Sequence, residues 1–436
     1  MDGIRAEGAR GVWNAAIERV IDVKKLGYLR SSGLGLCVLG ASLAGFAQAP
    51  APPAGYVLQW TDDFSGPALD ISKWNYRVDA KDFTAQRPQN VSLDGKGHLN
   101  IDLRQDEYGG KHFTAGGVVS TANFRYGYYE VLAKTTHYPG WHTAFWMLAG
   151  DGRLIPPRFP AVSNTWTEID DFEIEDPRVI SMGILEWQHG QNSGSTRCDQ
   201  HFVPGFDTAA AYHSYGLEWT EEQITYYLDG KAVCKQAYPP TQSPHDRLNI
   251  WLTSIAHKSG VPYTDKSVPS DIGLAVGSEP SPASFGRVAY YIRDYYTRDL
   301  EPGYAEYGPG WTDGMLPGYS RLGSRVSCSA GAVAVWTPTI LQPGRLDISV
   351  YRMSDQKYDP AATVTIHSRK GDSKKTLNFK SGNEGWSDLG NFVLDSGATD
   401  FVTLQGSGQG CIYADTVKFV RRQPSQKNSG MHGRLK

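Results

Sequence analysis

The sequence lacks a strong charge bias, a cysteine-based metal motif and convincing helical periodicity. Its 436 residues carry a formal net charge of -3, so neither a basic field nor an acidic tail favours a nucleic-acid or scaffold partner. It contains no CxxC pair or Cys/His cluster, and we expect no metal ligands and no required cofactor. These absences argue against nucleic-acid binding and against zinc chemistry.

Aromatic residues and glycine are abundant, with 12 Trp, 24 Tyr and 48 Gly. From residue 56 to residue 296, short alternating segments are separated by turn signals such as Asp94-Gly95 and Asp229-Gly230. The segments include VLQWTDDF, LNIDLRQD, YGYYEVLAKT, TAFWML, HSYGLEWT, QITYYLDGKAV and RVAYYIRDYY. This pattern predicts an all-β protein whose main domain is an antiparallel sandwich, able to hold a long polymer on a concave face.

The length indicates more than one domain. Lys24, Lys25 and Arg30 precede the apolar run GLGLCVLGASLAGF, so residues 1–47 are interpreted as a secretory signal peptide and leader. The run is too short to span a bilayer, which predicts secreted or periplasmic export without a membrane span. Four further segments are expected along the chain: a catalytic sandwich at 54–300, a loosely packed Gly/Pro/Tyr-rich linker at 301–324, a smaller β-sandwich at 325–422 and a disordered tail at 423–436.

Removal of the leader takes away Cys37 and leaves four cysteines in an oxidising compartment. With a domain boundary near residue 310, each domain holds two of them. The simplest connectivity therefore joins Cys198 to Cys234 and Cys328 to Cys411. The alternative is four free, buried thiols.

The segment TEIDDFEI places three acids close together. In a strand, alternate side chains share a face, so Glu168 and Asp170 lie together while Glu173 is out of step. One extra residue at Asp171 or Phe172, accommodated as a β-bulge, returns Glu173 to their face. The prediction is a row of three acids on one face of a bulged strand.

Such a row suits the cleavage of glycosidic bonds. Like charges at short range keep one carboxyl protonated, and a retaining glycosidase needs one ionised and one protonated carboxyl about 5–5.5 Å apart. Glu168 and Glu173 are the candidate pair, and Asp170 between them could hold the nucleophile in place.

Other readings of the segment remain open. It could be an exposed acidic strand, or a calcium site built from neighbouring carboxylates. In an unbulged strand, Asp171, Glu173 and Glu175 would instead share a face.

Aromatic and imidazole side chains near the acids are candidate sugar ligands. Trp166 lies two residues before Glu168 and therefore on the same face, where its indole could stack on a sugar ring. Further candidates for substrate binding are Trp141, His142, Trp187 and His189. A core position is equally expected for Trp146, Trp219 and Trp251.

From Val57 to Tyr296 the chain resembles glycoside hydrolase family 16. TEIDDFE matches that family's signature of Glu, any, Asp, any, any, Glu in its bulged version, and flanking matches are WTDDFSG, QNVSLDGKGHLNI, YGYYEVLAK and TAFWML. The resemblance implies a β-jelly-roll sandwich that cuts or rearranges β-glucans and β-galactans. It also implies that Glu168 is the nucleophile, Glu173 the acid/base and Asp170 the assisting carboxylate, and Asn90 joins the substrate-binding candidates.

The sequence departs from this family at positions that bear on substrate and metal. Many members carry Trp-Pro before Ala-Phe-Trp, whereas here His142 and Thr143 stand before Ala144. The aspartate expected in the last strand is replaced by Tyr290, which argues against the family's structural calcium site. The sugar is therefore left open among laminarin, mixed-linkage glucan and galactans.

The C-terminal region resembles the golvesin-like domain that is also attached to some polysaccharide lyases, such as xanthan lyase. The matching parts are Ala334 to Pro338, Gly385 to Gly390 and the closing segment YADTVKF. No acidic pair in this region suggests catalysis.

The leading hypothesis is a secreted, monomeric, retaining endo-β-glycanase. Its expected partner is a polysaccharide, namely β-1,3- or β-1,3/1,4-glucan or a related β-galactan. A transglycosylase would use the same acids. A non-catalytic sugar-binding protein and a calcium-dependent structural sandwich are alternatives from other classes.

Overall fold

The computed structural model describes residues 50–149, 165–188, 191–238, 245, 247–258, 272, 281–320 and 323–421. The expected signal segment and the expected disordered tail lie outside this described part. Residues 48–436 belong to one compact unit. Among the described residues, no helix is long and apolar enough to cross a membrane.

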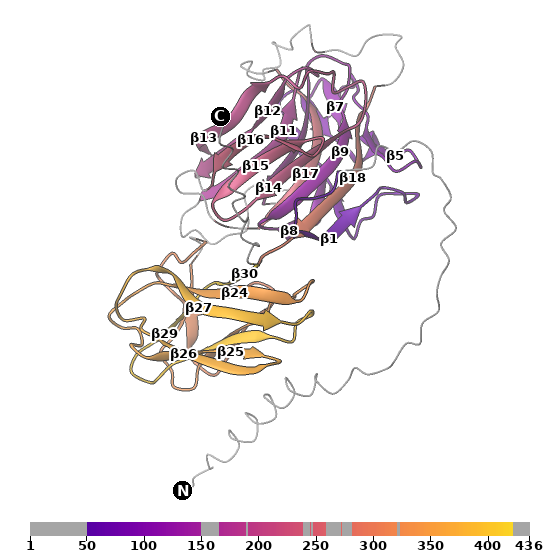
Figure 1. Cartoon of the computed structure of the whole chain (residues 1–436). Helices are drawn as coiled ribbons and strands as arrows, with labels where there is room; N and C mark the ends of the chain where they lie inside the picture. The colour runs from indigo at the N-terminus through magenta and orange to yellow at the C-terminus, as the bar shows by residue number, and fades with distance from the viewer. Residues whose placement is uncertain are drawn as a thin grey trace, which may run out of the picture. The chain divides into compact units, whose positions relative to one another are not determined.

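The larger domain is a sandwich of two antiparallel sheets, as the alternation in the sequence predicts (Figure 1). In order across the eight-stranded sheet lie β16 (Lys231–Ala237), β15 (Gln223–Leu228), β14 (His213–Trp219), β9 (Gly127–Lys134), β18 (Ala283–Ile292), β6 (Leu99–Ile101) and β5 (Val91–Leu93), and β1 (Val57–Asp62) also pairs with β18. The seven-stranded sheet consists of β13 (Gln191–Phe202), β12 (Ile180–Gln188), β11 (Thr165–Ile174), β10 (Trp141–Leu148), β17 (Leu248–Ala256), β8 (Gly117–Phe124) and β2 (Trp74–Tyr76).

Smaller elements lie beside the two main sheets. A short 3₁₀ turn spans Pro88–Asn90. A three-stranded sheet is formed by β3 (Ala80–Lys81), β4 (Thr84–Gln86) and β7 (Phe113–Ala115).

Alternate side chains of facing strands fill the space between the two large sheets. Tyr129 and Val131 of β9 and Ile169 and Phe172 of β11 are completely buried in one apolar cluster. Burial of each such side chain stabilises the fold by about 1.5–3 kcal/mol. Because this burial fixes which face of β11 points inward, Glu168, Asp170 and Glu173 are left on the outer face of the seven-stranded sheet.

The two predicted disulfides are confirmed. Cys198 of β13 is bonded to Cys234 of β16, and Cys328 is bonded to Cys411. β13 and β16 are edge strands of different sheets, so the first disulfide ties the two layers of the larger sandwich together.

Removing this cross-layer disulfide is expected to destabilise the larger domain. The Cys198→Ala/Cys234→Ala double variant should lose about 2–4 kcal/mol of unfolding free energy. The reason is that the disulfide joins two residues 36 positions apart and so restricts the conformations of the unfolded chain, and the variant removes this restriction. Urea denaturation followed by tryptophan fluorescence measures the loss. An unchanged denaturation midpoint would contradict this role.

The second domain is also a β-sandwich, in agreement with the prediction. One sheet contains β19 (Tyr295–Thr297), β30 (Val417–Arg421), β24 (Gly344–Arg352) and β27 (Gly385–Leu394). The other contains β20 (Tyr304–Tyr307), β23 (Val333–Trp336), β28 (Phe401–Gln405), β25 (Ala362–Ser368) and β26 (Gly371–Leu377). A third, small sheet is formed by β21 (Trp311–Asp313), β22 (Arg325–Ser327) and β29 (Ile412–Ala414).

The segment 301–324 is not a loose linker, and the described part of it belongs to the second domain. It contributes β20 and β21, which pair with β23 and β22. Glu301 is buried and accepts a hydrogen bond of 2.8 Å from the Arg125 guanidinium, and Tyr319 is buried as well. The Gly and Pro residues form turns between short paired strands, a pattern that composition alone does not distinguish from a linker.

Tyr290 of β18 stands where the family resemblance leads us to expect an aspartate of a structural calcium site. Its hydroxyl donates to the backbone carbonyl oxygens of Arg125 (2.7 Å) and Tyr126 (2.8 Å), and the side chain is buried. Both carbonyls therefore receive a proton donor from within the protein, which leaves them less suited to bind a cation.

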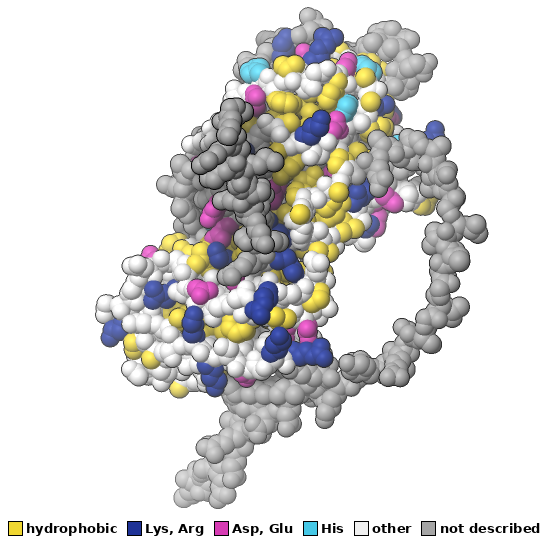
Figure 2. Space-filling model, viewed as in Figure 1, with side chains coloured by type: hydrophobic (Ala, Val, Ile, Leu, Met, Phe, Trp, Pro, Cys, Tyr) yellow, Lys and Arg dark blue, Asp and Glu magenta, His cyan; other side chains and the backbone are white. Residues whose placement is uncertain are grey.

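The surface visible in Figure 2 mixes charges of both signs. Lys and Arg side chains are interspersed with Asp and Glu, in keeping with the small formal net charge of -3. This mixture of charges agrees with a partner that the protein does not attract through a large surface of one charge sign.

Candidate active site

The predicted bulge in β11 is confirmed. Against β10, Phe145 pairs with Phe172 while Trp146 pairs with Asp170, so Asp171 is the extra residue. The register of β11 against β12 shifts over the same stretch, between Asp170 and Glu173. The bulge returns Glu173 to the face occupied by Glu168 and Asp170, and we call this outer face of the seven-stranded sheet the acid face.

Asp171 excludes the alternative register. Its side chain is only 3% exposed, and its charge acts on Tyr215 and Tyr226 of the opposite sheet, so it points into the sandwich. Within the part of the chain that the structure describes, its Oδ2 atom has no hydrogen-bond partner, and burial raises the pKa of the Asp171 carboxyl well above its usual range. Asp171 and Glu173 therefore lie on opposite faces.

Arg197 of β13 connects two of the three acids. Its Nη1 atom donates to Asp170 Oδ2 at 3.1 Å and to Glu173 Oε2 at 2.6 Å. Gly183 of β12 lies between Asp170 and Arg197 in the sheet, and a Cβ there would come within 2.6 Å of Arg197 Cδ. The absence of a side chain at Gly183 thus lets the guanidinium reach across β12.

Glu173 is ionised in this arrangement. Burial raises the pKa of its carboxyl, but His142 and Arg197 outweigh that effect and lower the pKa to about 2. The His142 Nε2 atom lies 3.3 Å from Glu173 Oε1, and both side chains are largely buried.

The pKa of the Glu168 carboxyl is shifted in the opposite direction, upward. Burial and the negative charge of Glu173 raise the pKa of Glu168 to about 7, although the Trp187 Nε1–H group donates to Glu168 Oε2 at 2.7 Å and opposes the rise. The pKa of Asp170 is also raised well above its usual range, by burial and then by the charges of Glu173 and Glu168. The free protein therefore keeps its proton on the Glu168 side of the cluster, whereas the sequence-based mechanism places it on Glu173.

Replacing Trp187 by Phe should shift the titration of Glu168 upward. Phe keeps an aromatic ring beside Trp166 but removes the N–H donor that favours the ionised carboxylate. A charge-assisted hydrogen bond of about 1.5 kcal/mol corresponds to a rise of about one pKa unit. The alkaline limb of the pH–rate profile reports this shift, and an unmoved limb would contradict the role of the indole.

Four tryptophans form an aromatic floor on the acid face. Trp166 and Trp187 stack with their rings 6.5 Å apart and 11° from parallel, and Trp146 stacks on Trp251 at 4.7 Å. They belong to a cluster separate from the main core, and Trp146 lies directly opposite Asp170 in the sheet. The Arg77 guanidinium lies over the Trp146 and Trp251 rings, at 5.8 and 5.5 Å.

Trp166 lies on the predicted face, and its role in sugar binding stays a prediction. Trp146 and Trp251 lie on the acid face and not in the main core. Trp219 does belong to the main core. Arg77 and Arg197 were missed by the sequence reasoning, because an isolated arginine in a polar segment gives no signal of the partner that the fold brings to it.

Two of the predicted sugar ligands, Trp141 and Asn90, have buried side chains. Trp141 is 1% exposed and packs edge-on against Phe113 in the main core, because strand alternation turns it away from His142. Asn90 is also 1% exposed, and its amide donates to the Asp102 carbonyl and the Thr114 hydroxyl. His189 lies outside the described residues.

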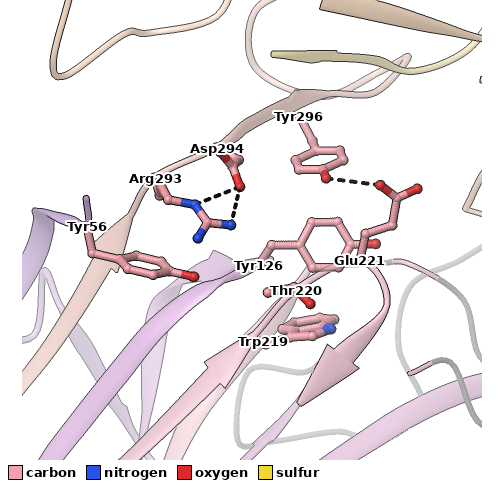
Figure 3. Close-up of a pocket in the computed structure, with 9 residues that line it drawn as sticks. Tyr56, Tyr126, Trp219, Thr220, Glu221, Arg293, Asp294 and Tyr296 are labelled. Atoms are coloured by element: carbon pink, nitrogen blue, oxygen red, sulfur yellow. Dashed lines mark hydrogen bonds and ion pairs between the residues drawn. The ribbon is translucent and has the colours of Figure 1, made fainter. Parts of the chain in front are cut away.

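A separate pocket lies beside the eight-stranded sheet (Figure 3). The Tyr296 hydroxyl donates to Glu221 there at 3.1 Å, and Trp386 and Lys418 of the second domain donate to the same carboxylate. The remaining residues that line the pocket are Tyr56, Tyr126, Gly127, Trp219, Thr220, Arg293 and Asp294. Since Glu221 is engaged in joining the domains and none of the three acids of β11 lines this pocket, the acid face is the better candidate for the active site.

Family comparison agrees with this arrangement. The model for Glycosyl hydrolases family 16 matches residues 79–255, which include the bulged strand and all three acids. The larger domain belongs to glycosyl hydrolases family 16. The model for the Golvesin C-terminal domain matches residues 318–421, so the family 16 domain is followed by a golvesin-type β-domain.

The family 16 domain has several characterised relatives at modest identity. Glucan endo-1,3-beta-glucosidase A1 of Niallia circulans is 29% identical over 233 residues, which cover 44% of this chain and 32% of that protein. Endo-1,3-1,4-beta-glycanase ExsH of Rhizobium meliloti (strain 1021) is 31% identical over 177 residues, which cover 40% of this chain and 33% of that protein. The chain thus spans about a third of the length of these two relatives.

A solved structure is similar to part of the chain. The kappa-carrageenase of Pseudoalteromonas carrageenovora, in complex with an oligotetrasaccharide of kappa-carrageenan, matches with a TM-score of 0.45 and 22% identity. The match covers 57% of this chain and 99% of that one.

Proposed function

We propose that this protein is a retaining endo-β-glycanase that acts on the acid face of its family 16 domain. The observation that carries the proposal is the bulge at Asp171, which puts Glu168, Asp170 and Glu173 side by side on one strand. Two glutamates separated by an assisting aspartate supply the nucleophile and the acid/base of a double displacement.

In the first step Glu168 attacks the anomeric carbon, and Glu173 gives its proton to the leaving oxygen. In the second step Glu173 takes a proton from water, which attacks the glycosyl-enzyme and releases the sugar with its original configuration. Asp170, held by Arg197 at 3.1 Å, keeps the acid row aligned. Because burial and the charge of Glu173 raise the pKa of Glu168 while His142 and Arg197 lower the pKa of Glu173, a proton has to shift toward Glu173 before the first step.

The aromatic floor supports a β-glycan as substrate. Indole faces stack on the apolar faces of pyranose rings, and Trp166 and Trp187 adjoin Glu168, to which Trp187 is hydrogen-bonded. Of the two relatives described above, one is named as a glucan endo-1,3-beta-glucosidase and the other as an endo-1,3-1,4-beta-glycanase. We therefore rank β-1,3- and β-1,3/1,4-glucans before β-galactans.

Export is part of the proposal. The apolar N-terminal run precedes two disulfides, and disulfides persist in oxidising compartments outside the cytosol. An enzyme for long polysaccharides also meets its substrate there.

A reducing-end assay on laminarin, lichenan, agarose, porphyran and carrageenan tests the proposal. We expect new reducing ends and a ladder of oligosaccharides from laminarin or lichenan, with products first released in the β configuration. Binding of a glycan without any new reducing end would instead favour a sugar-binding protein. Products longer than the starting oligosaccharide would favour a transglycosylase, which uses the same acids.

A further inference from the structure

Three side chains that are far apart in the sequence converge next to the acid row. His142 lies at the start of β10, Glu175 directly follows β11, and His257 directly follows β17. β10 pairs with both other strands, so the three positions come together at one end of the seven-stranded sheet. One nitrogen of each imidazole and one oxygen of Glu175 all lie within 4.8 Å of one another.

The spacing of these atoms matches a metal coordination sphere. Glu175 Oε1 lies 3.2 Å from His142 Nδ1 and 3.3 Å from His257 Nε2. Ligands on a tetrahedral zinc ion, with bonds of about 2.0–2.1 Å, are about 3.3 Å from each other. Two of the three edges therefore already have the required length, and the third, between the two imidazole nitrogens, is at most 4.8 Å.

The outer nitrogens of the two imidazoles supply a second, independent observation. His142 directs Nε2 at Glu173, 3.3 Å away, and His257 directs Nδ1 at Asp82, 2.9 Å away. Metal-binding histidines characteristically donate their second ring N–H to a carboxylate, which fixes the tautomer and the ring orientation. In each of these histidines, one ring nitrogen faces the centre of the cluster and the other faces an orienting carboxylate.

The local charge also fits a cation. Asp82, Glu173 and Glu175 place three carboxylates around two imidazoles. A divalent ion at the centre would take the place of the proton on His142 Nδ1 and offset two of the three negative charges.

The geometry points to a divalent transition-metal site of the zinc type, with His142, Glu175 and His257 as ligands and Asp82 and Glu173 as orienting carboxylates. The ion fixes the His142 ring with its Nε2–H directed at Glu173, and so joins this end of β10, β11 and β17. Three protein ligands leave at least one coordination position for water. The assignment rests on these contacts alone and holds whether or not the protein cleaves glycans.

Metal titration of the full chain tests the site. After treatment with a chelator and dialysis, we expect the protein to bind one equivalent of Zn²⁺ by calorimetry. Co²⁺ in its place should give the visible absorption of a tetrahedral nitrogen and oxygen site. Added Zn²⁺ should also raise the unfolding temperature, because an ion that binds only the folded chain stabilises it.

Two variants and a matched control locate the binding. His257→Gln removes one ligand and should weaken Zn²⁺ binding by at least about 100-fold, while Asp82→Asn removes only an orienting partner and should weaken it by about 10–100-fold. His112→Gln is the control, because His112 likewise faces a single carboxylate, Glu107 at 2.6 Å, outside the cluster. It should bind Zn²⁺ like the wild type.

Unchanged near-ultraviolet circular dichroism of the metal-free variants establishes that they fold. Absence of Zn²⁺ binding to the wild type at about 100 µM would overturn the site. So would binding that His257→Gln and Asp82→Asn leave unchanged, because the ion would then lie elsewhere. These outcomes are independent of the reducing-end assay, so failure of the metal site and failure of the proposed activity can be told apart.

Discussion

Replacing Glu168 or Glu173 by Gln is expected to lower kcat on the preferred β-glycan by at least about 10³-fold, since each variant removes one of two groups on which the double displacement depends. Both substitutions nearly preserve side-chain volume. The fold should persist, because the core face of β11 is filled by Ile169 and Phe172 and not by the acids. Initial rates of reducing-end release measure the loss.

Asp171→Asn is the matched control for these variants. It changes an acid of the same strand whose side chain points into the sandwich and whose pKa burial raises well above its usual range. An amide of similar shape should therefore leave kcat within about threefold of the wild type, in line with the small effect of shape-conserving exchanges. A loss as large as that of Glu168→Gln would show that strand geometry, and not the acid face, limits the rate.

External azide separates the roles of the two glutamates. In Glu168→Ala, azide can enter the space left by the nucleophile and attack an activated aryl β-glycoside from the opposite face, giving an α-glycosyl azide. In Glu173→Ala, the glycosyl-enzyme still forms with a good leaving group, and azide attack on it gives a β-glycosyl azide. The reverse pairing of products would exchange the two roles, and full activity of either Gln variant would refute the mechanism.

The second large effect is a loss of activity above neutral pH. We expect kcat/KM to fall about tenfold for each pH unit above about 7, because this ratio reports the ionisation of the free enzyme. Burial and the charge of Glu173 raise the pKa of Glu168 to about 7, while His142 and Arg197 hold the pKa of Glu173 near 2 against the effect of burial.

The fall of kcat/KM at alkaline pH follows from the number of protons that Glu168 and Glu173 hold together. Between about pH 2 and 7 the two glutamates share one proton, which rests mainly on Glu168 but is available to Glu173. Above about pH 7 that proton is lost from the pair, and Glu173 then has no proton from Glu168 to pass to the leaving oxygen. The alkaline limb therefore reports the last proton of the pair, whichever glutamate carries it.

Initial rates on a neutral β-glucan from pH 5 to pH 9 measure this limb. Circular dichroism in the same buffers separates ionisation from unfolding. A rate that rises between pH 6 and pH 8 would contradict the shared proton and would indicate that Glu173 keeps its own proton throughout that range.

Local sequence was sufficient for the features that depend on neighbouring residues. Strand alternation around Ile169 and Phe172, together with the position of Glu173, predicted the bulge and the acid row, because a two-residue period allows only one way to bury both apolar side chains. The two disulfides were also predictable, since one pair of cysteines in each domain leaves a single simple connectivity.

Sugar-binding positions within or beside a recognisable motif were less reliable. Trp141 and Asn90 belong to promising segments, yet strand alternation and the hydrogen-bonding needs of a buried turn put both inside the protein. The segment 301–324 has the composition of a linker, but its turns connect strands whose partners follow about 12 to 30 residues later.

The sequence by itself determined the β-architecture, the cysteine pairing and the identity of the acid row, because each of these follows from periodicity or from nearby residues. Only the tertiary structure decided which side chains surround the acids. Arg197 reaches Asp170 across Gly183, and His257 meets His142 from a strand more than a hundred residues away. Such contacts are set by the pairing of distant strands, and they govern the proton on Glu168 and Glu173 because electrostatic effects depend on distance in space and not along the chain.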